Sequence, residues 1–231
     1  DMNQSAVQRI LGALTERGYI SRPPGGRKYQ LTLALWELGS QVIEHHPQRR
    51  LLHPILRFAA QSTGFTAFLT YQAHPFMVYQ DKVEGAHGRA HSNEPGNRVP
   101  IHRTAAGKAI LAYLPTQMVR SLAKPQSDWS GFMTVDAIDP DSLTEEINAI
   151  RRRRYAVSQG GMTLGVNSVA CPIWSESEIP FGSIALTAEE RDLPADRFPE
   201  LGEMLLSMAR EATVALGGLH YQQAAENAVM V

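Results

Sequence analysis

Polar side chains near the start of the chain are of the types that read nucleic acid. They lie beside an apolar stripe with helical spacing, formed by Val7, Ile10, Leu11 and Leu14. Asn3 or Ser5 can cap this helix, and Gly18 can end it. From a helix in a major groove, such side chains hydrogen-bond to base edges and phosphates. The candidate DNA-binding residues of this helix are Gln4, Ser5, Gln8 and Arg9.

A basic turn follows the helix. The β-prone runs 19–21 and 29–31 flank a Pro/Gly segment and predict a hairpin, on which Arg27 and Lys28 are candidate phosphate contacts. Residues 1–30 hold five cations and two acidic residues, a net charge of +3, whereas the whole chain has a net charge of −1. Positive charge is thus concentrated where DNA would bind. This layout is that of a winged helix; an ordinary amphipathic helix with a solvated turn is the alternative.

A helix-turn-helix requires a helix before the recognition helix, and the sequence starts at Asp1. We therefore expect residues 1–33 to be a partial winged helix-turn-helix whose first helices lie upstream. A second apolar stripe, formed by Leu35, Leu38, Val42 and Ile43, predicts a helix that ends before Pro47. We interpret residues 34–47 as a linker helix whose stripe can pair with a second copy of itself.

A second kind of chemistry is indicated at Thr104, where a helix over residues 104–114 is predicted to begin. Thr104 is the expected cap, and Ala105 and Ala106 leave the first turn with small side chains. Unpaired N–H groups and the helix dipole make such a turn a candidate site for an anion or a carboxylate. Close packing of the helix against a sheet explains the same small residues equally well.

Two strands are predicted over residues 166–173 and 181–187, and their alternation separates two faces. One face carries only small or hydroxyl-bearing side chains, namely Ser168, Ala170, Pro172, Ser183, Ala185 and Thr187. Such a face fills little volume. It would form a hollow lined by hydroxyls if it lay opposite the helix that begins at Thr104, and small-molecule sites are built in this way.

Catalytic and metal-binding alternatives rest on fewer residues. Cys171 could act as a nucleophile with His102 as its base, but it lies mid-strand, where an inert buried thiol is the stronger interpretation. A single cysteine excludes an internal disulfide and a cysteine-cluster zinc site. Adjacent His45 and His46 point to different sides of a helix, so we expect no metal site. We also predict no cofactor.

The remaining pattern is that of an ordinary globular protein. Helices are predicted over residues 48–63, 143–155 and 198–216, and strands over 65–71, 77–83 and about 88–92. Because no apolar run approaches eighteen residues and no signal peptide is visible, we expect a cytoplasmic protein without a membrane partner.

Taken in order, these segments resemble the IclR family of bacterial transcriptional regulators. The resemblance rests on Ser5-Ala6-Val7-Gln8-Arg9-Ile10-Leu11 with Gly18-Tyr19, on Pro100-Ile101-His102 with Thr104-Ala105-Ala106-Gly107-Lys108-Ala109, on Tyr155-Ala156-Val157-Ser158, and on Ala170-Cys171-Pro172-Ile173. It covers nearly the whole chain.

The resemblance implies an α+β protein with the partial winged helix, the linker helix, a GAF-like effector-binding domain over residues 48–218 and a tail over 219–231. That domain would have a central antiparallel sheet flanked by helices. It also implies a homodimer or tetramer on palindromic operator DNA, with a small organic or aromatic acid as effector. Carried over by position, the effector-binding residues are Ala105, Ala106, Ser158, Ser168, Ala185 and Thr187, and Thr104, the expected helix cap, completes the candidate set.

This sequence departs from some relatives at two pocket positions. Ser158 stands where some relatives have an acidic residue, and Ala185 where some have a serine. The resemblance therefore implies a less polar pocket, which favours a larger or more apolar acid over a two-carbon acid. A DNA-binding regulator that is not an enzyme is the interpretation we favour. The alternatives are a cytoplasmic enzyme that uses Cys171 and His102, and a ligand sensor that acts only through protein partners.

Overall fold

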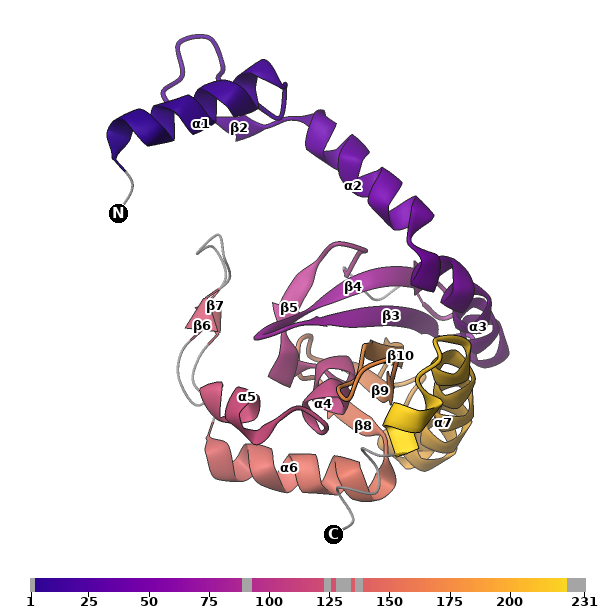
Figure 1. The fold of residues 1–231 in the computed structure, drawn as a ribbon. Helices are drawn as coiled ribbons and strands as arrows, with labels where there is room; N and C mark the ends of the chain where they lie inside the picture. The colour runs from indigo at the N-terminus through magenta and orange to yellow at the C-terminus, as the bar shows by residue number, and fades with distance from the viewer. Residues whose placement is uncertain (1–2, 89–92, 123–125, 128–133, 136–138, 224–231) are drawn as a thin grey trace. The chain divides into compact units, whose positions relative to one another are not determined.

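A computed structural model describes residues 3–88, 93–122, 126–127, 134–135 and 139–223 of the chain (Figure 1). The chain forms two compact units, residues 1–50 and residues 51–231. Each unit is described separately. No helix within the described ranges is both long enough and apolar enough to cross a membrane.

The first unit begins with α1 (Gln4–Glu16), and the Asn3 side chain accepts a hydrogen bond from the Ala6 N–H at its start. Gly18 follows the helix at φ 72°, a left-handed conformation that glycine adopts without strain. Strand β1 (Ile20–Ser21) then pairs antiparallel with β2 (Gln30–Leu31). Helix α2 (Leu33–His45) completes the unit. The predicted helix and hairpin are therefore both present.

The second unit is built on a six-stranded antiparallel sheet with the strand order β5-β4-β3-β10-β9-β8. Its strands are β3 (Thr66–Ala73), β4 (Phe76–Val83), β5 (Arg98–Pro100), β8 (Ala156–Gln159), β9 (Val166–Ile173) and β10 (Gly182–Glu189). Strand β10 lies inside the sheet and joins the β3–β4 hairpin to the β8–β9 hairpin. A separate pair, β6 (Gln126–Ser127) and β7 (Thr134–Val135), lies outside this sheet.

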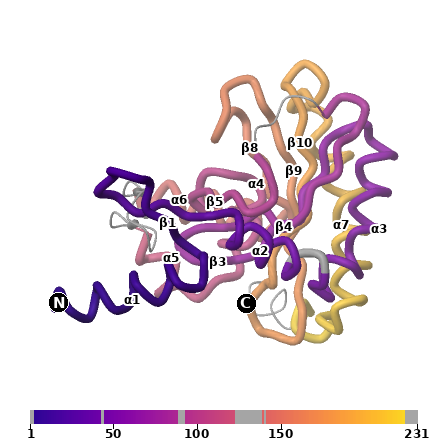
Figure 2. The backbone as a smooth tube through the Cα atoms, turned by 90° about the horizontal axis from the view of Figure 1, so that it is seen from above, coloured from indigo at the N-terminus to yellow at the C-terminus, as the bar shows by residue number. Residues whose placement is uncertain are grey.

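Helices cover both faces of the sheet. Helices α3 (Pro47–Thr63) and α7 (Phe198–Ala215) run side by side along one face (Figures 1 and 2). On the other face, the 3-10 helix η1 (Ile101–Arg103) leads into α4 (Ala105–Leu111), and α4 packs on β9 and β10. Helix α6 (Pro140–Arg153) packs against α4. The described part of the chain also contains the short helices α5 (Thr116–Ser121) and η2 (Ala195–Arg197) and a helical segment over residues 219–223.

The core consists of two apolar clusters, one on each face of the sheet. Neighbouring residues of one strand enter different clusters, as strand geometry requires: Ala170 and Ala185 face α4, whereas Cys171 and Ile184 face α3 and α7. The predicted α+β class, with an antiparallel sheet flanked by helices, is confirmed by this arrangement.

The predicted elements differ from the observed ones mainly at their ends. The helix predicted over residues 104–114 is an α-helix only to Leu111, with turns after it. The edge strand β8 was not predicted, because its four residues are too few to show an alternation. Residues 89–92 of the strand predicted over about 88–92 lie outside the described residues, and β5 is the strand that pairs with the far side of β4.

The start of α4 lies unusually close to η1, and this makes Gly107 a test of the packing. A Cβ at Gly107 would lie 1.8 Å from the Ile101 carbonyl oxygen. Helix propensity alone favours Gly107→Ala by about 1 kcal/mol, but the overlap with backbone outweighs it. We expect this change to destabilise the second unit by about 3 kcal/mol, measured by chemical unfolding followed by circular dichroism.

Gly12→Ala is the matched control, because Gly12 lies within α1 and a Cβ there would meet nothing within 4 Å. We expect this change to be neutral or slightly stabilising. Equal stability of the two variants would contradict the close approach of α4 to η1 at Gly107.

Candidate functional site

A pocket lies on the α4 face of the sheet, within the second unit. Its empty space, counted together with the open solvent at its mouth, is about 470 Å³. Its walls combine aromatic, apolar and hydroxyl-bearing side chains. The lining residues are Phe68, Tyr79, Asn93, Arg103, Thr104, Ala106, Ser158, Gly161, Met162, Thr163, Val166, Ser168, Ala185 and Thr187.

The floor of the pocket is set by strand register. Thr187 lies opposite Ser168, and Ser168 lies opposite Ser158, so hydroxyls from β10, β9 and β8 form one row across the sheet. Ala185 lies opposite Phe68 on the other side of β10. The floor therefore has a hydroxyl end towards β8 and an aromatic end towards β3 and β4.

Hydrogen bonds between buried groups hold α4 over this floor. The Ser183 hydroxyl donates to the Ala106 carbonyl oxygen at 3.0 Å, and the Thr70 and Ser183 hydroxyls are 2.7 Å apart. The Thr104 hydroxyl accepts from the Gly107 N–H at 3.0 Å and so caps the helix. Ala106 is left on the pocket wall.

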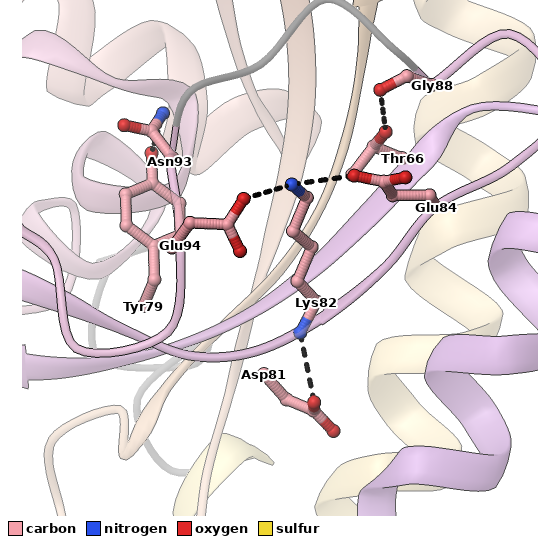
Figure 3. Close-up of polar contacts among 8 residues, drawn as sticks. All are labelled: Thr66, Tyr79, Asp81, Lys82, Glu84, Gly88, Asn93 and Glu94. Carbon is pink, nitrogen blue, oxygen red and sulfur yellow. Dashed lines mark hydrogen bonds and ion pairs between the residues drawn. The ribbon is translucent and has the colours of Figure 1, made fainter. Parts of the chain in front are cut away.

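The aromatic end is formed by Phe68 and Tyr79, whose rings pack edge to face with their centres 4.9 Å apart. The Asn93 amide donates to the Tyr79 hydroxyl oxygen at 3.1 Å (Figure 3). Burial raises the pKa of Tyr79 to about 12, so the phenol stays neutral near pH 7. Since its oxygen accepts from Asn93, the phenol proton remains available as a donor.

Lys82 is close to this end but is already paired. Its ammonium group lies 2.8 Å from Glu84 and 2.7 Å from Glu94 (Figure 3). Burial by itself lowers the pKa of Lys82, but hydrogen bonds to and charges of the two carboxylates outweigh it and leave the pKa raised. Lys82 thus anchors the segment that follows β4. A second contact holds the same segment: the Thr66 hydroxyl donates a hydrogen bond of 2.9 Å to the Gly88 carbonyl oxygen (Figure 3).

The positive charge of the pocket comes from Arg103. Among the described lining residues it is the only cation, and none is a carboxylate. The exposed guanidinium donates a long hydrogen bond of 3.4 Å to the Gly161 carbonyl oxygen. A Cβ at Gly161 would lie 2.4 Å from both the Arg103 carbonyl oxygen and the Ser158 hydroxyl. The absence of a side chain at Gly161 therefore lets this loop close against the hydroxyl end of the pocket.

The structure brings together most of the residues predicted for this pocket. Thr104, Ala106, Ser158, Ser168, Ala185 and Thr187 all line it, whereas Ala105 is fully buried and does not. Phe68, Tyr79, Asn93, Arg103 and Gly161 were not predicted. The signal for Arg103 was present in the sequence, because a cation directly precedes the small-residue start of a helix.

The candidate DNA-binding residues all lie in the first unit and are exposed. Gln4, Ser5, Gln8 and Arg9 are on α1, and Arg27 and Lys28 are in the turn between β1 and β2. The neighbouring Arg22 has a structural role: its Nε donates to the Gly26 carbonyl oxygen at 2.7 Å, and its guanidinium lies 5.8 Å from the centre of the Tyr29 ring.

The geometry gives no support to the catalytic alternatives. Cys171 is fully buried in the cluster under α3 and α7, on the sheet face opposite to α4 and its leading turn η1, which holds His102. A histidine–hydroxyl pair is present elsewhere, where His74 Nε2 lies 2.9 Å from the Ser121 hydroxyl. Ser121 donates its own proton to the Met118 carbonyl oxygen, so His74 is the donor in this pair and does not activate the hydroxyl. The described residues also contain no group of three potential metal ligands.

Comparison with known proteins places this fold in a class of ligand-responsive regulators. The model of the family "Bacterial transcriptional regulator IclR C-terminal" matches residues 40–214. The chain is 26% identical over 218 residues to the transcriptional repressor IclR of Escherichia coli (strain K12), a match that covers 93% of this chain and 79% of that protein.

Solved structures agree with this match. The crystal structure of Thermotoga maritima IclR superposes with a TM-score of 0.70 at 27% identity and covers 94% of this chain and 87% of that one. An IclR homologue from Microbacterium hydrocarbonoxydans, solved in complex with 4-hydroxybenzoate, superposes with a TM-score of 0.67 at 20% identity and covers 93% and 86%. That second likeness shows the fold alone.

The chain therefore belongs to the IclR family of bacterial transcriptional regulators. It carries the effector-binding C-terminal domain of that family and is not an enzyme.

The thiol of Cys171 offers a direct check on its inert role. Burial, as the largest cause, raises the pKa of Cys171 well above its usual value, with a smaller contribution from the charge of Glu203. The reactive thiolate is thus scarce at pH 8, where a free thiol is partly ionised. We expect iodoacetamide to label the folded protein far more slowly than the urea-unfolded protein, measured by mass spectrometry. Labelling of the folded protein at the rate of a free thiol would contradict the buried placement.

Proposed function

We propose that this protein is a transcriptional regulator that binds operator DNA through its first unit and senses a small carboxylic acid in the pocket of its second unit. The observation that carries the effector half is the pocket's charge: Arg103 is positive and the described lining residues include no carboxylate. An anion is attracted to such a pocket, and the hydroxyl row supplies further hydrogen-bond donors.

The DNA-binding half is supported by the first unit. An exposed polar face on α1 is followed by a hairpin whose turn exposes Arg27 and Lys28. Because Arg22 is held within the hairpin by Gly26 and Tyr29, the two cations at the far side of the turn are the free candidates for phosphate contact. Within a winged helix, α1 would be the recognition helix and the hairpin the wing.

The effector we propose is larger or more apolar than a two-carbon acid. Ala185 and Phe68 supply apolar floor, and Ser158 adds a hydroxyl without a charge. The 4-hydroxybenzoate bound by the Microbacterium hydrocarbonoxydans homologue shows that this fold can hold an aromatic acid. The pocket beside α4 is consistent with the same class of ligand.

We further propose that the protein acts in the cytoplasm as a homodimer or tetramer. Helix α2 exposes apolar side chains that a monomer would leave in water, Leu33 at 76%, Trp36 at 70% and Val42 at 64%. A second copy can cover them, and two copies match the two halves of a palindromic operator. An effector then changes DNA binding only if it binds one arrangement of the copies more tightly than the other.

DNA binding can be tested by fluorescence anisotropy of the full-length protein on a duplex from its own promoter region, against a scrambled duplex. We expect sequence-dependent binding that weakens steeply with salt. Gln8→Ala should reduce the preference for the operator. Arg27→Ala and Lys28→Ala should weaken binding to both duplexes and lower the salt slope by about one for each phosphate that is no longer neutralised.

Arg191→Ala is the charge-matched control, since Arg191 is an exposed cation of the second unit that pairs with Glu189. It should leave the salt slope unchanged. Equal, weak binding of the unmodified protein to operator and scrambled duplexes would favour a sensor that acts only through protein partners.

Effector class can be tested by calorimetric titration of the protein with acids of increasing size. We expect at least one aromatic or longer-chain carboxylate to bind more tightly than glyoxylate and pyruvate, because the floor offers apolar area that two- and three-carbon acids cannot cover. Tighter binding of glyoxylate or pyruvate than of every larger acid would refute this proposal.

A further inference from the structure

The pocket is chemically asymmetric, and this asymmetry sets how an acid would lie in it. The hydroxyl row of Thr187, Ser168 and Ser158 runs from β10 to the edge strand β8. The aromatic pair of Phe68 and Tyr79 lies on β3 and β4, on the opposite side of β10. A ligand that spans the floor meets donors at one end and a ring edge at the other.

Arg103 stands at the hydroxyl end. Its guanidinium contacts the Gly161 carbonyl oxygen, and a Cβ at Gly161 would touch both the Arg103 backbone and the Ser158 hydroxyl, so these three residues converge. The hydrogen bond to Gly161 is 3.4 Å long and uses one of five guanidinium N–H donors. The other donors can bind a carboxylate in the bidentate manner for which arginine is suited.

Lys82, a described cation close to the pocket, cannot take this role. Lys82 is held by Glu84 and Glu94 and is not a lining residue. At the aromatic end, Tyr79 remains a neutral phenol, which can donate one hydrogen bond but carries no charge. Among the described lining residues, Arg103 is therefore the one that carries a positive charge.

We propose that Arg103 determines the orientation and the charge class of the effector. Its guanidinium binds the carboxylate at the hydroxyl end, and the apolar body of the acid lies on Ala185 and Phe68. The distance across the sheet from β9 to β3 is two strand spacings, about 10 Å, so the inferred ligand is a monocarboxylic acid with an aromatic or apolar group a few bonds from the carboxylate. This inference rests on the proposed function of the pocket as the effector site.

The test compares 3-phenylpropionate with its neutral amide, 3-phenylpropanamide, in calorimetric titrations of the full chain. We expect Arg103→Gln to weaken binding of the acid roughly tenfold and to leave binding of the amide unchanged, because only the acid forms a charge-assisted hydrogen bond with the guanidinium. Arg103→Lys should recover part of the affinity. Since Arg103 is exposed, the acid's affinity for the unmodified protein should also fall with added salt.

Two further variants separate charge from shape. Phe68→Leu should weaken binding of the acid and binding of the amide by similar factors, because it removes apolar contact area and no charge. Arg152→Gln removes an equivalent exposed cation from α6, outside the pocket lining, and should change neither affinity.

Each negative outcome has a distinct meaning. If the unmodified protein binds acids and Arg103→Gln binds them equally well, the proposed orientation is wrong while the effector site stands. If Arg103→Gln weakens acid and amide alike and Arg103→Lys recovers nothing, Arg103 only supports the loop at Gly161, and the inference fails. If no carboxylic acid binds the unmodified protein at all, the effector proposal and this inference fail together.

Discussion

The pairing register of β10 is the constraint on which the rest of the second unit depends. This strand pairs with β3 on one side and β9 on the other, and it places Ala185 opposite both Phe68 and Ala170. Its alternate residues Ile184 and Leu186 enter the core under α3 and α7. A slip of one residue would exchange the two sets, bury hydroxyls under the helices and fill the pocket with branched side chains. Burial of one apolar set on each face therefore fixes the register, and the pocket floor follows from it.

Small residues do two things at once on the α4 face. Gly107 allows the start of α4 to touch η1, and the Ser183 hydroxyl holds the Ala106 carbonyl, so the helix packs closely at this point. Beside that close approach, other short side chains leave space, where Ala106 forms pocket wall and Ala185 forms pocket floor. Close packing and a binding hollow were alternatives when only the sequence was considered. In the structure they are neighbouring parts of one surface.

The part of the site that could be predicted is the part governed by local periodicity. Two-residue alternation along β9 and β10 was enough to group Ser168, Ala185 and Thr187 on one face. Phe68 and Tyr79 were missed because they reach the pocket through the pairing of β3 with β10 and with β4, and pairing between distant strands leaves no local signal. Asn93 was missed because it follows β4 and reaches the pocket beside Tyr79, to which it donates a hydrogen bond. Strand β8 was not predicted because it is short, although its residue Ser158 was identified as a pocket residue through the family resemblance. The first helix and hairpin were predictable because their caps, turn residues and spacing all lie within about thirty residues.

The proposed preference for an anion rests on the charges around the pocket. Bringing a carboxylate out of water is costly unless the site supplies partners of opposite charge or several hydrogen-bond donors. The charge of Lys82 is already neutralised by Glu84 and Glu94, and this pairing holds the pocket wall in place. In the proposed site, Arg103 and the hydroxyl row would therefore offset the cost of taking the carboxylate out of water. Arg103 also contacts the loop at Gly161, while the hydroxyl row belongs to the sheet. An acid bound to both would therefore connect the loop to the sheet, and it would stabilise the conformation in which these two parts of the chain are correctly spaced.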